Sequence, residues 1–358
     1  MAVETQRPVD QAKVEEFAAR VLGNTSGAMV SLLASIGDRL GLFRELARGP
    51  ATSAELAVRA RVNERYAREW LGGMASAGYL THDRKSGRFS LPPEAVPVLA
   101  QEGGPHFLGG LFQMLPPMTR PFVRLATAFR TGRGVPQSEY DEDFWAGMER
   151  FTAGWFENFL LDEWLPGMPD VQAKLEYGAR LADVGCGSGR ALVKLAKAFP
   201  NSTFDGYDVT EQQLERAREN VKAAGVQDRV KLHRADAAEG LPEQYDIVTT
   251  FDVVHDAVNP RGLLKAIRQG LKPDGIYVCL DMNGAADLDG NAGPVGSLFY
   301  GFSLLYCLTT SLANGGEGLG TLGFHEQRVR DMAGEAGFAD VRRVPIDHPF
   351  NCLYEIRP

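Results

Sequence analysis

The segment Leu181-Ala-Asp-Val-Gly-Cys-Gly-Ser-Gly-Arg190 decides the fold of this chain. Its apolar first residues predict a β-strand, and Gly185, Gly187 and Gly189 predict a tight turn that leads into a helix. Because glycine has no Cβ, the backbone of such a turn can pass directly beneath a ligand. The segment therefore predicts a ligand-binding turn at the carboxyl end of a strand.

From Arg180 onward, short apolar runs alternate with amphipathic stretches. Strands are predicted at 181–184, 203–207, 230–233, 246–250 and 276–280, with helices at 191–198, 211–224 and 261–271. Such alternation predicts an α/β, Rossmann-like domain whose parallel sheet is covered by helices on both faces. Two more strands, at 341–345 and 352–356, are expected to complete a seven-stranded sheet as an antiparallel pair.

The N-terminal part of the chain follows a different pattern. Apolar residues within 14–48 recur at helical spacing, with a break expected at Gly23. Thr52 followed by Glu55 predicts a capped helix, a second helix comes next, and residues 79–91 predict a hairpin. Helix, helix and hairpin in this order predict a mainly α winged-helix domain.

Three parts are therefore expected along the chain. Residues 1–95 form a winged-helix and dimerisation domain, 96–175 a helical connector that contributes to a substrate pocket, and 176–358 the Rossmann-like core. The apolar N-terminal helices predict a homodimer, although helices that pack against their own chain would have the same pattern.

The formal net charge of −8 argues against nucleic acid or an anionic membrane as the main partner, because both require a basic surface. In a DNA-binding winged helix, the helix after Asn63 would read the DNA. There Glu64 and Glu69 balance Arg65 and Arg68. We therefore favour a dimerisation and substrate-covering role for this domain over DNA binding.

The cysteines Cys186, Cys279, Cys307 and Cys352 lie far apart, with no Cys-x-x-Cys pair. This spacing favours reduced thiols over a disulfide frame or a zinc site, and no metal is predicted. No signal peptide is visible between Met1 and Gln11, so a cytoplasmic location is expected.

Residues 290–316 contain no charged side chain. A membrane helix would be expected to have flanking lysines or arginines, and the Gly, Ser, Thr and Asn content dilutes the hydrophobicity. We therefore favour a buried helix that lines an apolar pocket over a membrane span.

Acidic residues at three predicted strand ends narrow the identity of the ligand. Asp208 follows the second strand, where it can accept both hydroxyls of a ribose. A dinucleotide site needs a third glycine for its pyrophosphate, but Arg190 stands there. Asp183 suits the ammonium of a methionine group, and Asp236 suits an adenine amino group. Taken singly, each aspartate could be a turn former or helix cap; together they favour S-adenosyl-L-methionine over a nicotinamide dinucleotide.

Four segments carry a resemblance to a known family. Asp183–Arg190, Gly206–Val209, Arg234–Ala237 and Leu271–Gly275 resemble the successive motifs of class I S-adenosylmethionine-dependent methyltransferases. The resemblance spans residues 180–281 and implies S-adenosylmethionine as cofactor. The residues that it implies for the cofactor are Asp183, Gly185, Cys186, Gly187, Gly189, Asp208, Val209, Asp236, Ala237, Phe251 and Met148.

The order of a winged helix and then this core further resembles small-molecule O-methyltransferases. Phe144-Trp-Ala-Gly-Met148 resembles that group's F-x-x-A-M segment, whose methionine lies near the reactive methyl. Val253-Val-His255-Asp256 resembles its V-L-H-D-W segment, whose histidine is the general base. Ala257 replaces the tryptophan, and the segment 283–324 more closely resembles uncharacterised bacterial winged-helix methyltransferases.

The resemblance implies methyl transfer to a small apolar or aromatic acceptor, most often at a hydroxyl oxygen. His255 is then the general base, since an imidazole has an unperturbed pKa near ~6.5. Asp256 either orients His255 or caps the next helix. The alternative function is a winged-helix DNA-binding regulator that uses the adenosylmethionine fold as a ligand sensor.

Overall fold

The computed structural model describes residues 9–358, which form two compact units. The first unit consists of the chain up to Pro117 together with Asp143–Phe151. The second consists of Met118–Glu142 and Thr152–Pro358. The predicted connector 96–175 is thus divided between the two units, and the predicted domain boundaries stay a prediction. The absence of a signal peptide was predicted from Met1–Gln11, most of which lies outside the described residues.

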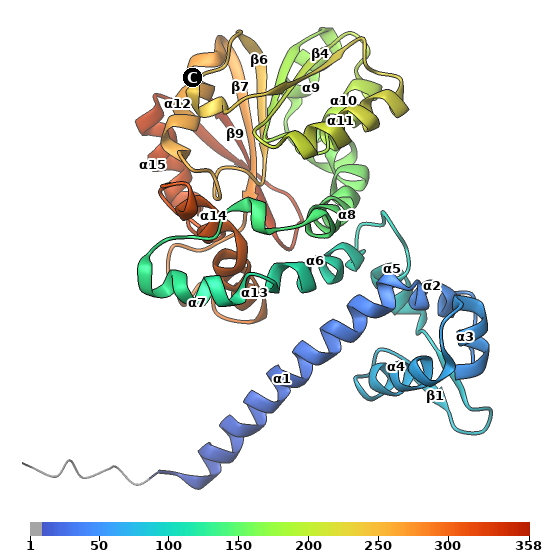
Figure 1. Ribbon diagram of the computed structural model, residues 1–358. Coiled ribbons are helices and arrows are strands. Elements are labelled where there is room, and N and C mark those ends of the chain that lie inside the picture. The colour runs from blue at the N-terminus through green and yellow to red at the C-terminus, as the bar shows by residue number, and fades with distance from the viewer. Residues whose placement is uncertain (1–8) are drawn as a thin grey trace, which may run out of the picture. The chain divides into compact units, whose positions relative to one another are not determined.

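The first unit contains the winged helix that the sequence predicts (Figure 1). Its elements are α1 (Gln11–Arg39), α2 (Leu42–Ala47), α3 (Ser53–Ala60), α4 (Glu64–Ser76), β1 (Thr81–Asp83) and β2 (Arg88–Ser90), the two strands being antiparallel. The predicted capping box is present, because Thr52 accepts from the Glu55 N–H and the Glu55 carboxylate accepts from the Thr52 N–H. Phe43 and Trp70 pack edge to face in the core, with ring centroids 5.2 Å apart.

The break predicted at Gly23 is wrong, because α1 continues through it without interruption. A glycine inside a helix costs about 1 kcal/mol relative to alanine, which the neighbouring turns of a long helix can offset. The N-terminal half of α1 exposes large apolar side chains such as Phe17 and Leu22. Such a surface is compatible with the predicted homodimer, which stays a prediction.

Short helices continue the chain after the hairpin. They are η1 (Pro93–Ala95), α5 (Val96–Leu99), α6 (Gly109–Thr119), α7 (Phe122–Thr131), η2 (Gln137–Glu139) and α8 (Glu142–Asn158). A π-helical turn, η3 (Leu160–Trp164), and a 3-10 turn, η4 (Leu165–Gly167), lead into α9 (Pro169–Tyr177).

The second unit contains the predicted seven-stranded sheet. Its strands are β3 (Arg180–Val184), β4 (Thr203–Asp208), β5 (Val230–Arg234), β6 (Tyr245–Phe251), β7 (Leu271–Met282), β8 (Asp340–Val344) and β9 (Asn351–Arg357). Their order is β5-β4-β3-β6-β7-β9-β8, and the first five in that order are parallel. The last two strands form the predicted antiparallel pair, and β9 runs antiparallel to β7.

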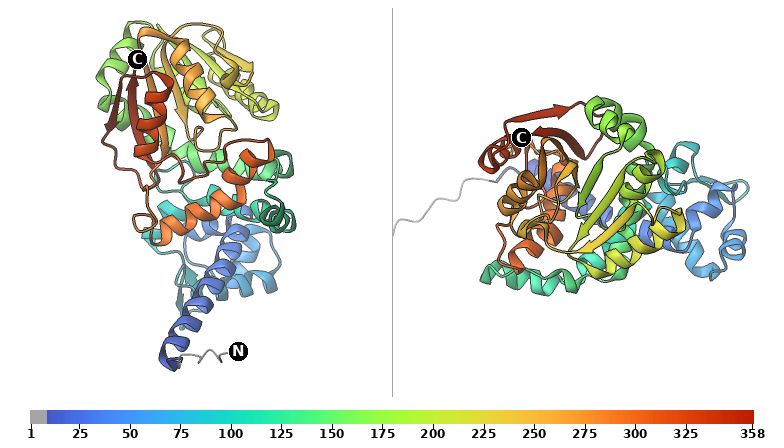
Figure 2. Two further views of the ribbon diagram at one scale, coloured as in Figure 1. Left: turned by 90° about the vertical axis from the view of Figure 1, so that its left-hand side faces the viewer. Right: turned by 90° about the horizontal axis from the view of Figure 1, so that it is seen from above.

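Helices cover both faces of this sheet (Figures 1 and 2). One face carries α10 (Arg190–Ala198) and α11 (Glu211–Ala224), and the other carries α12 (Pro260–Gly270) and α15 (Glu326–Ala336). Because β4 and β6 lie on opposite sides of β3, the strand order reverses beside the glycine turn. Ligands of open α/β sheets bind outside the carboxyl ends of the strands at such a reversal.

The uncharged segment forms one continuous helical stretch, made of α13 (Pro294–Phe302), the π-helical turn η6 (Ser303–Cys307) and α14 (Leu308–Ala313). By length and composition alone, Pro294–Ala313 is the one stretch within 9–358 apolar enough to cross a membrane. In the most apolar 18-residue window of this stretch, 39% is buried within the protein. Tyr300 and Leu304 are exposed. It is less buried than the sequence predicts.

Candidate active site

The glycine turn after β3 has the conformation that its sequence requires. Gly185, Gly187 and Gly189 all have left-handed φ angles, at 69°, 52° and 72°. A Cβ on Gly185 would lie 2.5 Å from a methyl carbon of Val253, so that glycine makes room for the Val253 side chain. At Gly187 a Cβ would meet no atom within 4 Å. The turn therefore presents a bare backbone beside open space, which fits a bound nucleoside.

Asp208 ties the end of β4 to this turn. Its carboxylate accepts from the Gly187 N–H at 3.0 Å and from the Thr210 N–H at 2.8 Å. Burial raises the pKa of this carboxyl, and the backbone donors oppose that shift. The next residue, Val209, is 54% exposed although it is apolar. An acceptor carboxylate followed by an open apolar surface suits a ribose and an adenine ring.

Asp183 lies directly before the turn and is almost fully buried. The Thr249 hydroxyl donates to its carboxylate at 2.7 Å. Burial raises the pKa of Asp183 to about 7, and the negative charge of Asp208 adds to the shift. A cationic group bound nearby would favour the ionised carboxylate, so the residue fits the ammonium of the predicted cofactor.

Asp236, predicted to read the adenine amino group, is exposed and caps a short helix. Its carboxylate accepts from the Ala238 N–H at 2.9 Å at the start of η5 (Ala237–Glu239). Helix capping is the structural role that the sequence also allowed for Asp236. The next residue, Ala237, is buried. Met148 belongs to α8 in the first unit, so its predicted place near the methyl group stays a prediction.

Phe251 ends β6 and belongs to an aromatic cluster of the second unit. Its ring contacts those of Phe156 and Trp164, with centroids 5.3 Å and 6.4 Å away. His348 also packs edge to face against Trp164, and burial lowers the pKa of this histidine to about 4. Aromatic groups therefore gather beside the carboxyl end of β6.

His255 lies on the turn after β6 and is buried. Its Nδ1 forms a 2.7 Å hydrogen bond with Oδ1 of Asp281, the penultimate residue of β7. That same oxygen accepts from the Met282 N–H at 2.8 Å. The other carboxylate oxygen of Asp281 is buried and has no hydrogen-bond partner in the described chain. The sequence did not single out Asp281, although it ends a strand as Asp208 does.

Charge sets the proton affinity of His255. Burial by itself would lower the pKa of the imidazole, but Asp281 and Cys307 together outweigh burial and raise that pKa well above its usual value. A carboxylate is an acceptor only, so it holds the proton on Nδ1 and leaves the lone pair on Nε2. An imidazole in this state can accept a proton at Nε2.

Asp256 does not cap the following helix. The cap of α12 is Asn259, whose side chain accepts from the Gly262 N–H at 2.9 Å. The carboxyl of Asp256 instead lies within 4.8 Å of the donor atoms of His255 and Cys307. Burial raises the pKa of Asp256 to about 6. The helix-capping role is therefore wrong, and the role of orienting His255 stays a prediction.

Asp252 is a second acidic residue here that sequence reasoning missed. Its φ angle of 58° is left-handed, which is uncommon for a residue with a side chain. The Asn351 side chain from β9 donates to its carboxylate, and burial raises the pKa of Asp252 to about 7. Backbone strain at a partly buried acid beside a candidate base is typical of functional sites.

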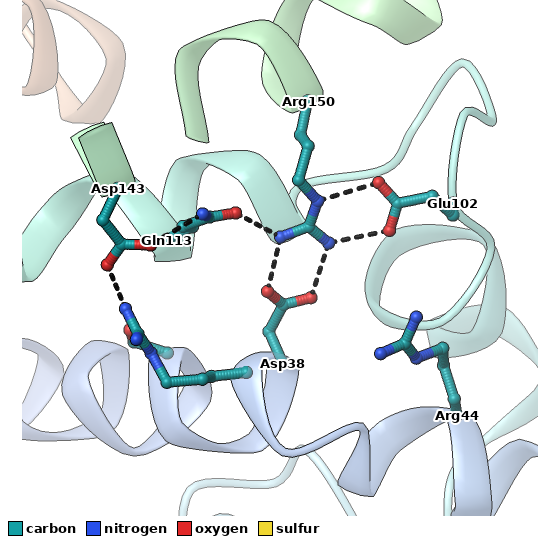
Figure 3. A pocket seen from close by; sticks show the side chains of 8 residues that line it. Asp38, Arg44, Glu102, Gln113, Asp143 and Arg150 are labelled. Atoms are coloured by element: carbon teal, nitrogen blue, oxygen red, sulfur yellow. Dashed lines mark hydrogen bonds and ion pairs between the residues drawn. The ribbon is translucent and has the colours of Figure 1, made fainter. Parts of the chain in front are cut away.

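A second polar cluster lines a pocket of about 400 Å³ in the first unit (Figure 3). At its centre, Arg150 donates to both oxygens of Asp38, at 2.8 and 3.1 Å, and to both oxygens of Glu102, at 2.7 and 2.8 Å. Gln113 accepts from Arg150 at 2.6 Å and donates to Asp143 at 2.8 Å. These groups pair with one another, so the cluster joins α1, α6 and α8 and offers no reactive atom.

Comparisons with known proteins agree with this architecture. Residues 182–277 match the family described as a methyltransferase domain, and residues 28–101 match the Rv2258c-like winged HTH domain. Over 326 residues, and 86% of each protein, the chain is 26% identical to the 3-hydroxy-5-methyl-1-naphthoate 3-O-methyltransferase of Streptomyces sahachiroi.

Two solved structures share the fold over nearly the whole chain. A candidate O-methyltransferase from Nostoc punctiforme gives a TM-score of 0.74 at 20% identity, covering 95% of this chain and 99% of that one. Human N-acetylserotonin methyltransferase, solved with S-adenosylmethionine, gives a TM-score of 0.67 at 20% identity, covering 99% of both chains.

Proposed function

The chain is an S-adenosylmethionine-dependent methyltransferase with an N-terminal winged-helix domain, and we propose that it methylates a hydroxyl oxygen of a small aromatic acceptor. His255 acts as the general base in this proposal. The observation that carries it is the 2.7 Å bond between His255 Nδ1 and the buried Asp281 carboxylate. That bond engages Nδ1, so Nε2 is the nitrogen left for proton transfer.

The bound cofactor supplies an electrophilic methyl carbon on a sulfonium. As the acceptor oxygen bonds to that carbon, the carbon–sulfur bond would break and leave a neutral thioether. His255 Nε2 would take the hydroxyl proton in this step and later release it to solvent. Asp281 stabilises the imidazolium formed in this step through its bond to Nδ1. Asp256 is a positioning residue in this proposal, because its carboxylate lies within 4.8 Å of a ligand atom of the base.

We assign the cofactor to the turn after β3. The bare backbone at Gly187 supports this assignment, as do the acceptor oxygens of Asp208 and the exposed apolar surface of Val209. Asp183 would hold the cofactor's ammonium from beneath the turn. The proposed set is completed by Gly185, Cys186, Gly189, Ala237, Phe251 and Asp236, and the place of Met148 near the methyl group stays a prediction.

Two observations support an aromatic acceptor. The rings of Phe251, Phe156 and Trp164 gather at the carboxyl end of β6, four residues before His255. Aromatic rings stabilise a flat apolar ligand by stacking and by burial. The relative from Streptomyces sahachiroi is named for a hydroxynaphthoate acceptor.

The test is transfer of a labelled methyl group to a panel of hydroxynaphthoates and simple phenols, each paired with the same ring lacking the hydroxyl. We expect label in the hydroxylated member of a pair only, recovered as a methyl ether by mass spectrometry. Label in both members, or on ring carbon, would contradict transfer to oxygen.

The alternative of a DNA-binding regulator has one supporting feature, the winged-helix match. On α4, however, Arg68 pairs with Glu64 at 2.6 Å and Arg65 pairs with Glu69, so both arginines are already neutralised. Phosphate affinity requires available positive charge. We therefore propose that the domain does not bind DNA. The four cysteines are all free thiols, which supports the cytoplasmic location that we also propose.

A further inference from the structure

His255 lies within a set of donor atoms of three chemical kinds. Its imidazole, the Asp256 carboxylate and the Cys307 thiol all place one ligand atom within 4.8 Å of one another. Cys307 is 7% exposed and comes from η6, far from the other two in sequence. Mixed nitrogen, oxygen and sulfur donors are the set that a divalent zinc ion prefers.

The orientation of His255 is that of a metal ligand. Its Nδ1 is occupied by the bond to Asp281, so Nε2 is the nitrogen that can coordinate an ion. Histidines that bind metals almost always donate their other ring N–H to a carboxylate or carbonyl in this way. Asp281 is fully buried, and its second oxygen has no hydrogen-bond partner within residues 9–358.

The turn that carries Cys307 is held in place from the segment before α8. The Val135 N–H donates to the Thr309 hydroxyl at 2.9 Å and to the Thr309 carbonyl at 3.1 Å. The Tyr140 hydroxyl donates to the Leu305 carbonyl. π-helical turns such as η6 occur frequently at functional sites. The position of the thiol is thus set by bonds on both sides of Cys307.

The same stretch is also fastened to the loop that carries His255. The Ser311 hydroxyl donates to the Ala257 carbonyl at 3.0 Å, and the Glu317 N–H donates to the Val258 carbonyl at 3.1 Å. These bonds lie two and three residues beyond His255 along the chain. They fix the spacing between the thiol and the imidazole.

Distances favour this donor set over its neighbour. Zinc bound at about 2.0–2.3 Å in a tetrahedron holds its ligand atoms about 3.3–3.8 Å apart, so the set closes with shifts of about one ångström. Asp252, His255 and Asp281 also lie within 4.8 Å of one another. There, however, the 2.7 Å contact between His255 and Asp281 is too short for two ligands of one ion and is a hydrogen bond.

We propose that His255, Asp256 and Cys307 form a zinc site, and that zinc bound there inhibits methyl transfer. Three protein ligands leave a fourth tetrahedral position for water, and binding releases to solvent the thiol proton and any proton held on Nε2. Inhibition follows because the Nε2 lone pair cannot both coordinate zinc and accept a proton. The inhibitory half rests on the proposed role of His255, whereas the binding half does not.

Binding is tested first, with zinc sulfate and the full-length protein in a phosphine reductant, by titration calorimetry and by competition with a chromophoric chelator. We expect one zinc per chain. Cys307→Ala is expected to weaken binding by more than the ~10–100-fold typical of losing an outer partner, and Asp281→Asn by about 10–100-fold. Cys279→Ala removes a buried thiol outside the donor set and is expected to change affinity less than ~2-fold.

Cobalt in place of zinc gives a direct readout of the sulfur ligand. A thiolate-to-metal charge-transfer absorption is expected in the wild type and in Cys279→Ala, and is expected to be missing in Cys307→Ala. Equal zinc affinity in wild type and Cys307→Ala, or equal loss in both cysteine variants, would overturn the site.

Inhibition is tested separately on the active enzyme. Stoichiometric zinc is expected to abolish transfer, a chelator to restore it, and Cys307→Ala to require at least ~10-fold more zinc for the same inhibition. Binding without inhibition would overturn the blocked base and leave the metal site standing. A protein that binds zinc through Cys307 but methylates no hydroxyl would instead overturn the proposed function alone.

Discussion

The Arg150 cluster of the first unit and the His255 cluster of the second are both built around a basic side chain and a buried aspartate. In the first, Arg150 bonds both oxygens of Asp38 and of Glu102, so neither carboxylate has an oxygen left over. In the second, Asp281 leaves one oxygen without a partner, and His255 keeps a nitrogen for other chemistry. A cluster whose polar atoms all have hydrogen-bond partners is typical of a structural role. A buried polar atom without a partner instead points to a role in binding or catalysis.

His255→Gln gives the largest effect expected from this contrast. Glutamine keeps the polarity of the site but has no nitrogen that can accept a proton, so kcat is expected to fall by ~10²–10⁴-fold. The unfolding midpoint should change far less, since the glutamine amide can still donate a hydrogen bond to the buried Asp281. Initial-rate kinetics and thermal unfolding of the same preparation measure the two effects. His106→Gln, an exposed histidine of the first unit, is the matched control and should keep both values.

Arg150→Met tests the other cluster and comes next in size. Methionine keeps much of the apolar stem but leaves Asp38, which is 9% exposed, without its partner. Breaking a well-buried ion pair costs ~3–5 kcal/mol, and since the Arg150 side chain is 26% exposed we expect about 2–3 kcal/mol of unfolding free energy. Denaturant unfolding measures this loss.

Its control is an ion pair of the same type on an open surface. Arg20 and Glu16 are 63% and 72% exposed, so Arg20→Met is expected to cost at most ~0.5 kcal/mol. If Arg150→Met unfolded at the same denaturant concentration as Arg20→Met, the cluster would not be structural, and the contrast with His255 would fail.

The sequence predicted those features that depend on neighbouring residues. The strand, glycine turn and helix at 181–198 are a local pattern, and so are the Thr52–Glu55 cap and the alternation that gives the sheet. Gly23 was misread because propensity at one position is weaker than the cooperativity of a long helix. Asp236 shows another limit of sequence reasoning, because one local pattern fits both a ligand contact and a helix cap.

The side chains that surround His255 could not be predicted from the sequence for a different reason, namely that they are distant from it along the chain. Its partners Asp281 and Cys307 come from the end of β7 and from a π-helical turn in the uncharged segment. Register across β6 and β7 brings the first beside it, and packing brings the second. An acidic residue at the end of a strand could have marked Asp281, but no local pattern marked Cys307.

The smallest effect expected, and the sharpest, concerns Asp281→Asn. Methyl transfer needs a neutral imidazole, so kcat/KM rises with pH through the pKa of His255, which Asp281 holds high. Removing the negative charge lowers that pKa, and the rising limb is expected to move to lower pH by about 1–3 units. The plateau also falls, because an asparagine amide can donate to Nδ1 and turn the lone pair away from the acceptor.

Asp289→Asn makes the same change in net charge at an exposed position. It is expected to leave the rising limb of the kcat/KM pH profile in place. A limb that moves equally in both variants would mean that overall charge, and not the buried pair, sets the proton affinity of the base. A limb that stays in place in Asp281→Asn would mean that the charge of Asp281 is already neutralised by a proton. In that case the shared proton would make the His255 pair as complete as the Arg150 cluster, and the difference between the two regions would lie in Cys307 and Asp256 instead.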